Sequence, residues 1–287
     1  MSEFPSLAKG EQADICLLLE GTYPYVRGGV SSWVHQLIRG LPEFRFALVF
    51  VGASRSFYPK MHYELPPNVC HMEVHFLSEN NQIEGPREQA GDNDWFAALD
   101  ELHTSLKDYH HCLNLQDVSA FIQQLCNRTG GEAEEFLYSE KAWGRITHGY
   151  RQNCPTMPFS DYFWNVRAMH SPLFSLLQIA MQAPQAHIYH TISTGYAGVL
   201  GFFLRVMRRR PLLLTEHGIY TKERYIDLYQ ADWIKEKELS LPMGLYAEIS
   251  YLRRLWGHFF EGLGRLTYSA CLQIITLYED NRIKQVE

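Results

Sequence analysis

Two adjacent glycines and two histidines are the residues of this chain whose types and spacing best suit ligand chemistry. Gly28 and Gly29 follow an apolar run and a loop, and Val30 begins an amphipathic segment directly after them. Adjacent glycines let a backbone come close to a ligand, and the free N–H groups at the start of a helix attract anions. The pattern predicts a site for a phosphorylated or sugar ligand near the start of the chain.

The two histidines follow later apolar runs. Ser193 comes shortly after His190, and Glu216 directly precedes His217. Ligands of open parallel sheets bind beyond the carboxyl ends of the strands, where these side chains and the glycine pair would meet. A lone histidine is more often structural, but two at equivalent positions favour a shared site. His217 suits a sugar hydroxyl or a phosphate, depending on its protonation.

Several of these residues also have plain structural interpretations. Glu216 can orient a ligand hydroxyl, or it can pair with Arg224. Arg224 can face a ligand, or it can be an exposed residue of a helix whose N-cap is Thr221. The glycine pair can serve only a turn that needs positive φ. The sequence leaves these alternatives open.

Metal and nucleophile chemistry are not indicated. The spacing of His71 and His75 suits zinc on a helix, but residues 69–77 alternate like a strand, which puts the pair ~13 Å apart. The sequence contains no serine nucleophile elbow. It also lacks the dinucleotide fingerprint and the P-loop. We predict no metal site and no cofactor.

The elements that position these residues follow a strand–helix rhythm. A strand–helix–strand opening implies a parallel sheet with right-handed crossovers. Predicted strands cover residues 14–19, 45–51, 69–77, 186–192, 211–215 and 272–277. Predicted helices cover 31–39, 94–126, 134–150, 161–181 with a break or kink at Ser171-Pro172, 195–210, 221–237 and 244–268. The predicted class is α/β, a Rossmann-like parallel sheet with a helical insertion at about 80–180 that covers one sheet edge.

Composition narrows the class of protein. The chain has 287 residues, of which 46% are hydrophobic, and a formal net charge of −6, so nucleic acid is not an expected partner. Its six cysteines form no CxxC pair, which favours a reducing compartment. We see neither a signal-peptide segment nor the ~20 apolar residues that span a membrane. The expected location is the cytoplasm.

The order of these motifs resembles the N-terminal half of the retaining, glycogen-synthase-like GT-B glycosyltransferases. The run Thr215-Glu216-His217-Gly218 is similar to the family's T-x-H-G, whose histidine contacts the transferred sugar. The segment from His190 is similar to V-H-x-H-D, but Ile192 and Ser193 replace the second histidine and the aspartate. The residues predicted to be catalytic are His217 and His190. The residues predicted to bind the sugar donor are Gly28, Gly29, Val30, Ser193, Glu216 and Arg224.

Residues 14–34 and 212–224 resemble, more narrowly, the cytosolic glycosyltransferases of Pel exopolysaccharide synthesis. That resemblance implies a UDP-sugar donor, usually UDP-glucose, and a growing polysaccharide acceptor destined for a biofilm matrix. It also implies partner proteins in an inner-membrane complex that recruits the cytoplasmic enzyme. Alternatives are a non-catalytic acceptor-binding or complex-assembly domain and a related enzyme with another UDP-sugar donor.

The resemblance implies that residues 1–287 form only the N-terminal GT-B domain. The C-terminal, donor-binding domain would carry a basic pair and an E-x7-E motif, and the resemblance assigns neither of them to residues 1–287. The sequence ends shortly after the start of a helix that begins near Tyr278, without a cap or a glycine stop. We therefore expect this chain to be part of a longer enzyme and to be inactive alone.

Overall fold

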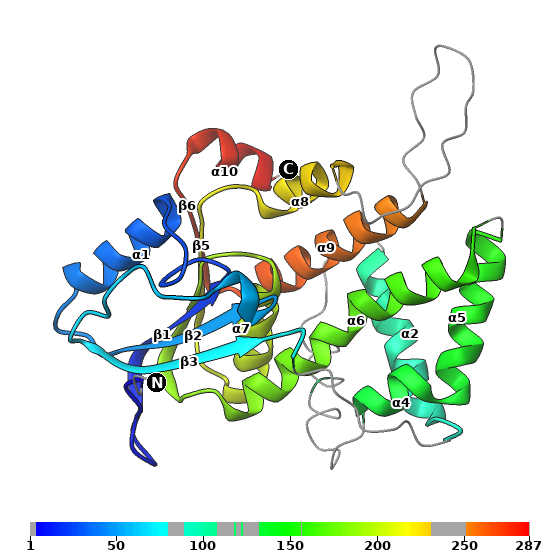
Figure 1. Ribbon diagram of the computed structural model, residues 1–287, viewed down its shortest axis with the longest axis horizontal. Coiled ribbons are helices and arrows are strands. Elements are labelled where there is room, and N and C mark those ends of the chain that lie inside the picture. Colours follow the sequence, from blue (N-terminus) through cyan, green and yellow to red (C-terminus); the bar gives the residue numbers. More distant parts are fainter. Residues whose placement is uncertain are drawn as a thin grey trace.

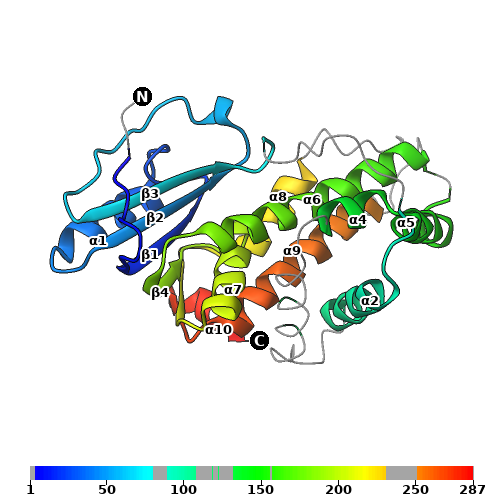
Figure 2. The same ribbon diagram turned by 90° about the horizontal axis from the view of Figure 1, so that it is seen from below.

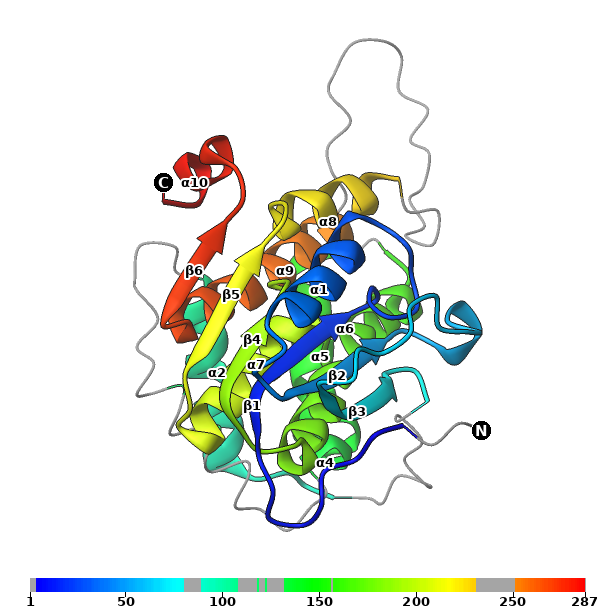
Figure 3. The ribbon, with the colours of Figure 1, turned by 90° about the vertical axis from the view of Figure 1, so that its left-hand side faces the viewer.

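The computed structural model describes residues 4–79, 89–107, 118, 122, 132–155, 157–230 and 251–286. Its centre is a six-stranded sheet, ordered β3-β2-β1-β4-β5-β6, in which all paired strands are parallel (Figure 3). The strands are β1 (Ala13–Glu20), β2 (Phe46–Gly52), β3 (Val69–Phe76), β4 (Ala186–Thr191), β5 (Leu212–Glu216) and β6 (Gln273–Thr276). Every strand end lies within one residue of its predicted position, which confirms the α/β class and the Rossmann-like sheet.

Helices lie on both faces of the sheet. They are α1 (Gly29–Gly40), the 3-10 helix η1 (Arg55–Phe57), α2 (Asn93–Lys107), α4 (Glu132–Tyr138), α5 (Glu140–Asn153), α6 (Phe159–Gln182), α7 (Tyr196–Arg208), α8 (Tyr220–Tyr229), α9 (Tyr251–Ala270) and α10 (Glu279–Val286). Parts of the predicted helices at 94–126, 221–237 and 244–268 and of the insertion at 80–180 fall outside the described residues.

Two apolar cores sandwich the sheet. Successive side chains of a strand point to opposite faces, so Leu18 of β1 enters one core and Leu17 and Leu19 enter the other. Helix α1 closes the second core with its buried Val34 and Ile38. Helix α7 lies against β1, β4 and β5 on the opposite face, and α6 and α9 pack on α7 (Figure 2).

The helices inserted between β3 and β4 extend to one side of the sheet (Figure 1). Their main packing partners among the described residues are α7 and α9, rather than an edge strand. Helix α6 runs through Pro172 without the predicted break. Proline removes the one backbone hydrogen bond that the Ala168 carbonyl would accept, and the buried side chains of Leu176 and Ile179 fix the following turns. No helix of the described ranges is both long and apolar enough to cross a membrane.

The order in which the chain adds strands to the sheet reverses at β1. The chain proceeds from β1 outward to β2 and β3, and then returns to place β4 on the other side of β1. Such a reversal leaves a crevice at the carboxyl ends of the two central strands, which is where open α/β sheets bind ligands. In this chain the crevice lies beside Glu20, where β1 ends, and Ile192, which follows β4.

Candidate functional site

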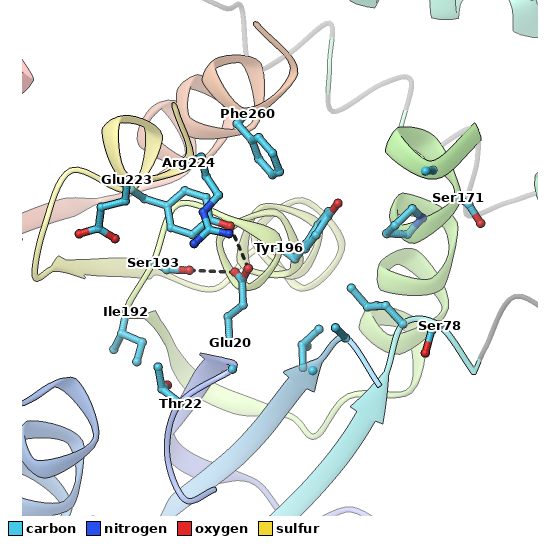
Figure 4. Close-up of a pocket in the computed structure, with 18 of the residues that line it drawn as sticks. Glu20, Thr22, Ser78, Ser171, Ile192, Ser193, Tyr196, Glu223, Arg224 and Phe260 are labelled. Carbon is cyan, nitrogen blue, oxygen red and sulfur yellow. Dashed lines mark hydrogen bonds between the residues drawn. The ribbon is translucent and has the colours of Figure 1, made fainter. Parts of the chain in front are cut away.

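A cavity of about 1070 Å³ lies at this crevice (Figure 4). Its volume is at the upper end of the range typical of small-molecule sites. Two walls face each other across it, one from the strand ends and one from the insertion. The strand-end wall comprises Glu20, Ser193, Glu216, His217 and Tyr220, and the insertion wall comprises Tyr138, Trp164, Arg167, Ser171 and Pro172.

Glu20 is the best-anchored group of the strand-end wall. Its Oε2 accepts hydrogen bonds from Ser193 Oγ and from the Ala197 amide, both at 3.0 Å. Its Oε1 accepts one from Tyr220 Oη, also at 3.0 Å. The carboxylate therefore ties β1 to the loop after β4, to the first turn of α7 and to α8, and it lies in the middle of the cavity (Figure 4).

Gly195 is required by this arrangement. A Cβ at that position would lie 2.4 Å from Tyr220 Oη and 2.6 Å from Glu20 Oε2. Such separations are far shorter than van der Waals contact, so a side chain would push the tyrosine or the carboxylate away. The glycine is therefore explained by close packing, because its backbone angles are not in the left-handed region.

Glu216 is a second, more deeply buried carboxylate. It is only 2% exposed and accepts hydrogen bonds from Thr194 Oγ1, the Tyr220 amide, Tyr268 Oη and Gln285 Nε2. Burial raises the pKa of Glu216 above its usual range, although these donors oppose the shift. Its bonds hold the end of β5 against α8, α9 and α10. The predicted alternative in which Glu216 pairs with Arg224 is therefore wrong.

His217 and His190 meet around a single indole. The Trp33 ring centroid lies 4.8 Å from that of His217 and 6.2 Å from that of His190, both edge to face. Burial, with a smaller contribution from His217, lowers the pKa of His190 to about 4, and burial also lowers the pKa of His217. Both imidazoles are neutral at pH 7 as a result.

The two histidines differ in what they offer a ligand. His190 Nε2 is bonded to Thr215 Oγ1 at 2.9 Å, and His190 does not line the cavity. His217 lines the cavity, and its Nε2 is buried with no hydrogen-bond partner among the described residues. A buried polar atom without a partner costs free energy unless a ligand or water satisfies it. His217 is therefore the histidine suited to ligand contact, with His190 behind it.

Gly28 and Gly29 do not line the cavity, although Val30, directly after them in α1, does. Gly21 and Thr22, at the start of the same loop, also line it. Gly28 has extended backbone angles (φ 169°, ψ 176°), so the alternative that the turn needs positive φ is wrong. A Cβ at Gly28 or Gly29 would meet no atom within 4 Å. Neither backbone strain nor packing explains the pair, which leaves the first amides of α1 open to approach.

Arg224 lines the cavity from α8. Its guanidinium pairs with Asp227 at 2.7 Å and lies 5.1 Å from the Tyr220 ring centroid. Helix α8 begins at Tyr220 with Ile219 as its N-cap, so Thr221 is not the cap that the exposed-residue alternative required. Ser193 and Glu216 also line the cavity, as predicted donor-binding residues.

The insertion wall is held together by stacking. The Arg167 guanidinium lies 4.2 Å from the Tyr138 ring centroid and 4.8 Å from that of Phe163, and it donates to the Leu137 carbonyl. Burial lowers the pKa of Arg167 from its ordinary value. The nearby turn of α6 contains Ala168 and Pro172, so the carbonyl that proline leaves without its helical donor belongs to this wall.

Sequence reasoning missed four residues of this region. They are Glu20, Tyr220, Trp33 and Arg167. The partners of Glu20 lie 173 or more residues away along the chain, so no local spacing reveals them. Its position directly after the first predicted strand, residues 14–19, was the one available signal, because strand ends are where ligands bind.

Metal chemistry finds no support in the described ranges, where no three His, Cys, Asp or Glu side chains are placed to hold an ion. His71 and His75 instead bond to opposite oxygens of Glu73, at 2.9 and 3.0 Å. Burial raises the pKa of Glu73, but the two histidines more than offset it and bring the pKa to about 2. The three residues form a hydrogen-bonded ladder along β3, and none of them lines the cavity.

Comparison with known proteins gives one assignment. No curated protein and no solved structure matches the chain. Residues 13–287 match the family model described as "Domain of unknown function (DUF3492)", and the chain therefore belongs to this family.

Proposed function

We propose that this chain is the N-terminal domain of a retaining glycosyltransferase that uses a nucleotide-diphosphate sugar. The observation that carries the proposal is the crevice at the sheet reversal. There an anchored carboxylate, Glu20, and a neutral histidine, His217, lie near the open first turn of α1. Carboxylates and a neutral imidazole suit the hydroxyls of a sugar, and free helix amides suit a diphosphate.

The sugar would occupy the strand-end wall. Glu20 accepts three hydrogen bonds and still has lone pairs for a hydroxyl donor. His217 Nε2, which has no partner in the described residues, would bond a second hydroxyl. Because its pKa is lowered, His217 would act as a neutral hydrogen-bonding group rather than as a cation. This favours the sugar over the phosphate as its contact.

The diphosphate would lie toward α1 and α8. The amides of Gly29 and Val30 belong to the first turn of α1, which contains no acidic residue. Arg224 lines the same cavity and would supply positive charge by turning from Asp227. Preorganised donors of this kind stabilise the charge that develops on a leaving diphosphate. No protein nucleophile is required by this scheme, and a second domain would complete the site and exclude water.

The narrower proposal is that the protein resembles PelF in activity. It would transfer glucose from UDP-glucose to a growing polysaccharide for a biofilm matrix. It would work in the cytoplasm, recruited to an inner-membrane complex, without binding nucleic acid. The motifs at residues 14–34 and 212–224 support this proposal. Another UDP-sugar, such as a UDP-N-acetylhexosamine, would fit the same strand-end wall.

The test uses the full-length protein that contains this chain together with a C-terminal domain. We expect UDP release from a UDP-sugar, and we expect His217→Ala to reduce it about a hundredfold. His187→Ala is the control, because His187 is exposed on β4 and does not line the cavity. Normal turnover by His217→Ala would remove the assigned role of His217, and no turnover with any UDP-sugar would refute the enzyme.

A non-catalytic acceptor-binding domain is the second candidate. The volume of the cavity and its mixture of carboxylates and aromatic side chains would also suit an oligosaccharide alone. Isothermal titration distinguishes the two candidates. Binding of UDP to the full-length protein supports the enzyme, whereas binding of oligosaccharides without UDP binding supports the second candidate.

A further inference from the structure

Two tryptophans stand unusually exposed on the insertion. Trp164 of α6 is 64% exposed, and Trp143 of α5 is 54% exposed. Tryptophan is on average a highly buried residue, so large exposed indoles that lie close together are informative. These two lie on neighbouring helices that pack against each other (Figure 1).

The two indoles belong to one aromatic row, defined as Trp143, Phe159, Phe163 and Trp164. The Phe163 centroid lies 5.1 Å from that of Trp164 and 6.1 Å from that of Trp143. Phe159 lies 5.4 Å from Trp143 and 5.8 Å from Phe163. The two phenylalanines are half-buried and support the exposed indoles, so the row is a fixed surface.

The aromatic row is continuous with the cavity. Trp164 lines the cavity and is also the last member of the row. Arg167, one turn further along α6, lies over the Phe163 ring and belongs to the insertion wall. A ligand that emerges from the cavity past the insertion wall therefore meets the row next.

We propose that the aromatic row binds the polysaccharide acceptor and guides one end of it into the cavity. This inference rests on the proposed function, which requires a glycan chain to reach the strand-end wall. Sugar rings present C–H groups that stack on the electron-rich face of an aromatic ring, while their hydroxyls stay hydrated. Exposed indoles flanked by polar positions such as Ser160 and Asp161 suit a hydrated, neutral chain of this kind.

The experiment titrates the 287-residue chain with maltohexaose, cellohexaose and chitohexaose and follows tryptophan fluorescence and heat. At least one hexaose is expected to bind. Trp164→Ala and Trp143→Ala should each weaken binding about tenfold, and Trp164→Phe should retain most of it. Phe57→Ala is the matched control, because Phe57 is 72% exposed but belongs to neither the row nor the cavity lining.

The outcomes separate this inference from the proposed function. Hexaose binding that the tryptophan variants weaken supports the row, even if the full-length protein turns over no UDP-sugar. If the full-length protein turns over a UDP-sugar but the wild type and both variants bind hexaose equally well, the proposal for the aromatic row is overturned. The proposed enzyme activity is then unaffected. Failure of every hexaose to bind also overturns the proposal for the aromatic row. The proposal is likewise overturned if sedimentation shows that the wild-type chain is a dimer and Trp143→Ala a monomer, while glycan binding is unchanged.

Discussion

The two walls of the cavity are built on opposite principles. The strand-end wall is a set of hydrogen bonds that join residues far apart in the chain, such as Glu20 with Tyr220. The insertion wall depends on stacking among side chains of the insertion itself, such as Arg167 on Tyr138 and Phe163. The first wall fixes the position of individual polar atoms, and the second presents broad surfaces with little directional demand.

The difference suits a division of labour. A reacting group must be held to within a fraction of an ångström, which favours preorganised hydrogen bonds. A chain that must slide between successive reactions needs contacts that tolerate displacement, and stacking supplies them. The comparison predicts that changes in the strand-end wall alter stability strongly, whereas changes in the insertion wall alter it weakly.

The largest expected effect concerns pH and His190. Its pKa is about 4 in the folded chain against 6.5 ordinarily, so the unfolded state takes up the proton first as the pH falls. Through His190, the free energy of unfolding is therefore highest above pH 6.5 and decreases as the pH falls toward 4. The decrease between pH 7 and pH 4 is about 3 kcal/mol. Urea unfolding at both pH values should show a smaller decrease for His190→Gln. His187→Gln on the same strand should behave like wild type, and an equal decrease in all three proteins would contradict the prediction.

The second prediction concerns crowding at Gly195. Gly195→Ala should lower the free energy of unfolding by about 2 kcal/mol, because its Cβ would overlap Tyr220 and Glu20. Gly144→Ala is the control, because Gly144 lies inside α5 and its Cβ would meet no atom within 4 Å. That variant should gain about 0.5 kcal/mol from helix propensity. Denaturant unfolding measures the free energy of unfolding of both variants. The prediction is contradicted if both alanine variants are stabilised or both are destabilised.

A smaller effect is expected in the insertion wall from Arg167→Lys. Lysine cannot reproduce the planar stacking of the guanidinium on two rings, so the loss should be about 1 kcal/mol. Arg151→Lys, at an exposed position near the end of α5, serves as the control with no expected change. Thermal unfolding compares the two. A loss for Arg167→Lys above that of Gly195→Ala would reverse the ranking of the walls.

The smallest expected effect is that of Trp164→Ala on stability. Because the indole is 64% exposed, its removal should change the free energy of unfolding by no more than about 0.5 kcal/mol. Thermal unfolding and circular dichroism of the variant check this expectation. A larger loss of free energy would mean that the indole stabilises the insertion. The glycan affinity of Trp164→Phe, rather than that of Trp164→Ala, would then test the role of the ring in binding.

Sequence reasoning reached the strands and the general place of the site. Apolar runs such as residues 14–19 and 45–51 are nearly continuous because both faces of a parallel sheet are buried, so their limits are visible locally. It placed Ser193, Glu216 and His217 at one cavity because all three lie at or just after strand ends. Arg224 also lines the cavity, but it lies further along the chain, within α8.

Other features depended on contacts that local patterns do not record. Glu20 looked like the polar end of a strand, and its three donors are brought to it only by the fold. Trp33 looked like an apolar helix residue, although its ring contacts both His190 of β4 and His217, which follows β5. Pro172 predicted a break because the packing of α6 on α7 cannot be seen in the sequence.

The crowding at Gly195 also constrains the history of the chain. Positions 20, 195 and 220 touch one another within van der Waals limits, so none can be replaced freely while the other two stay as they are. A side chain at 195 is less costly in a lineage that has already lost the tyrosine at 220 or the glutamate at 20. Among descendants of a common ancestor, a side chain at 195 should therefore be found mainly where position 20 or position 220 has also changed.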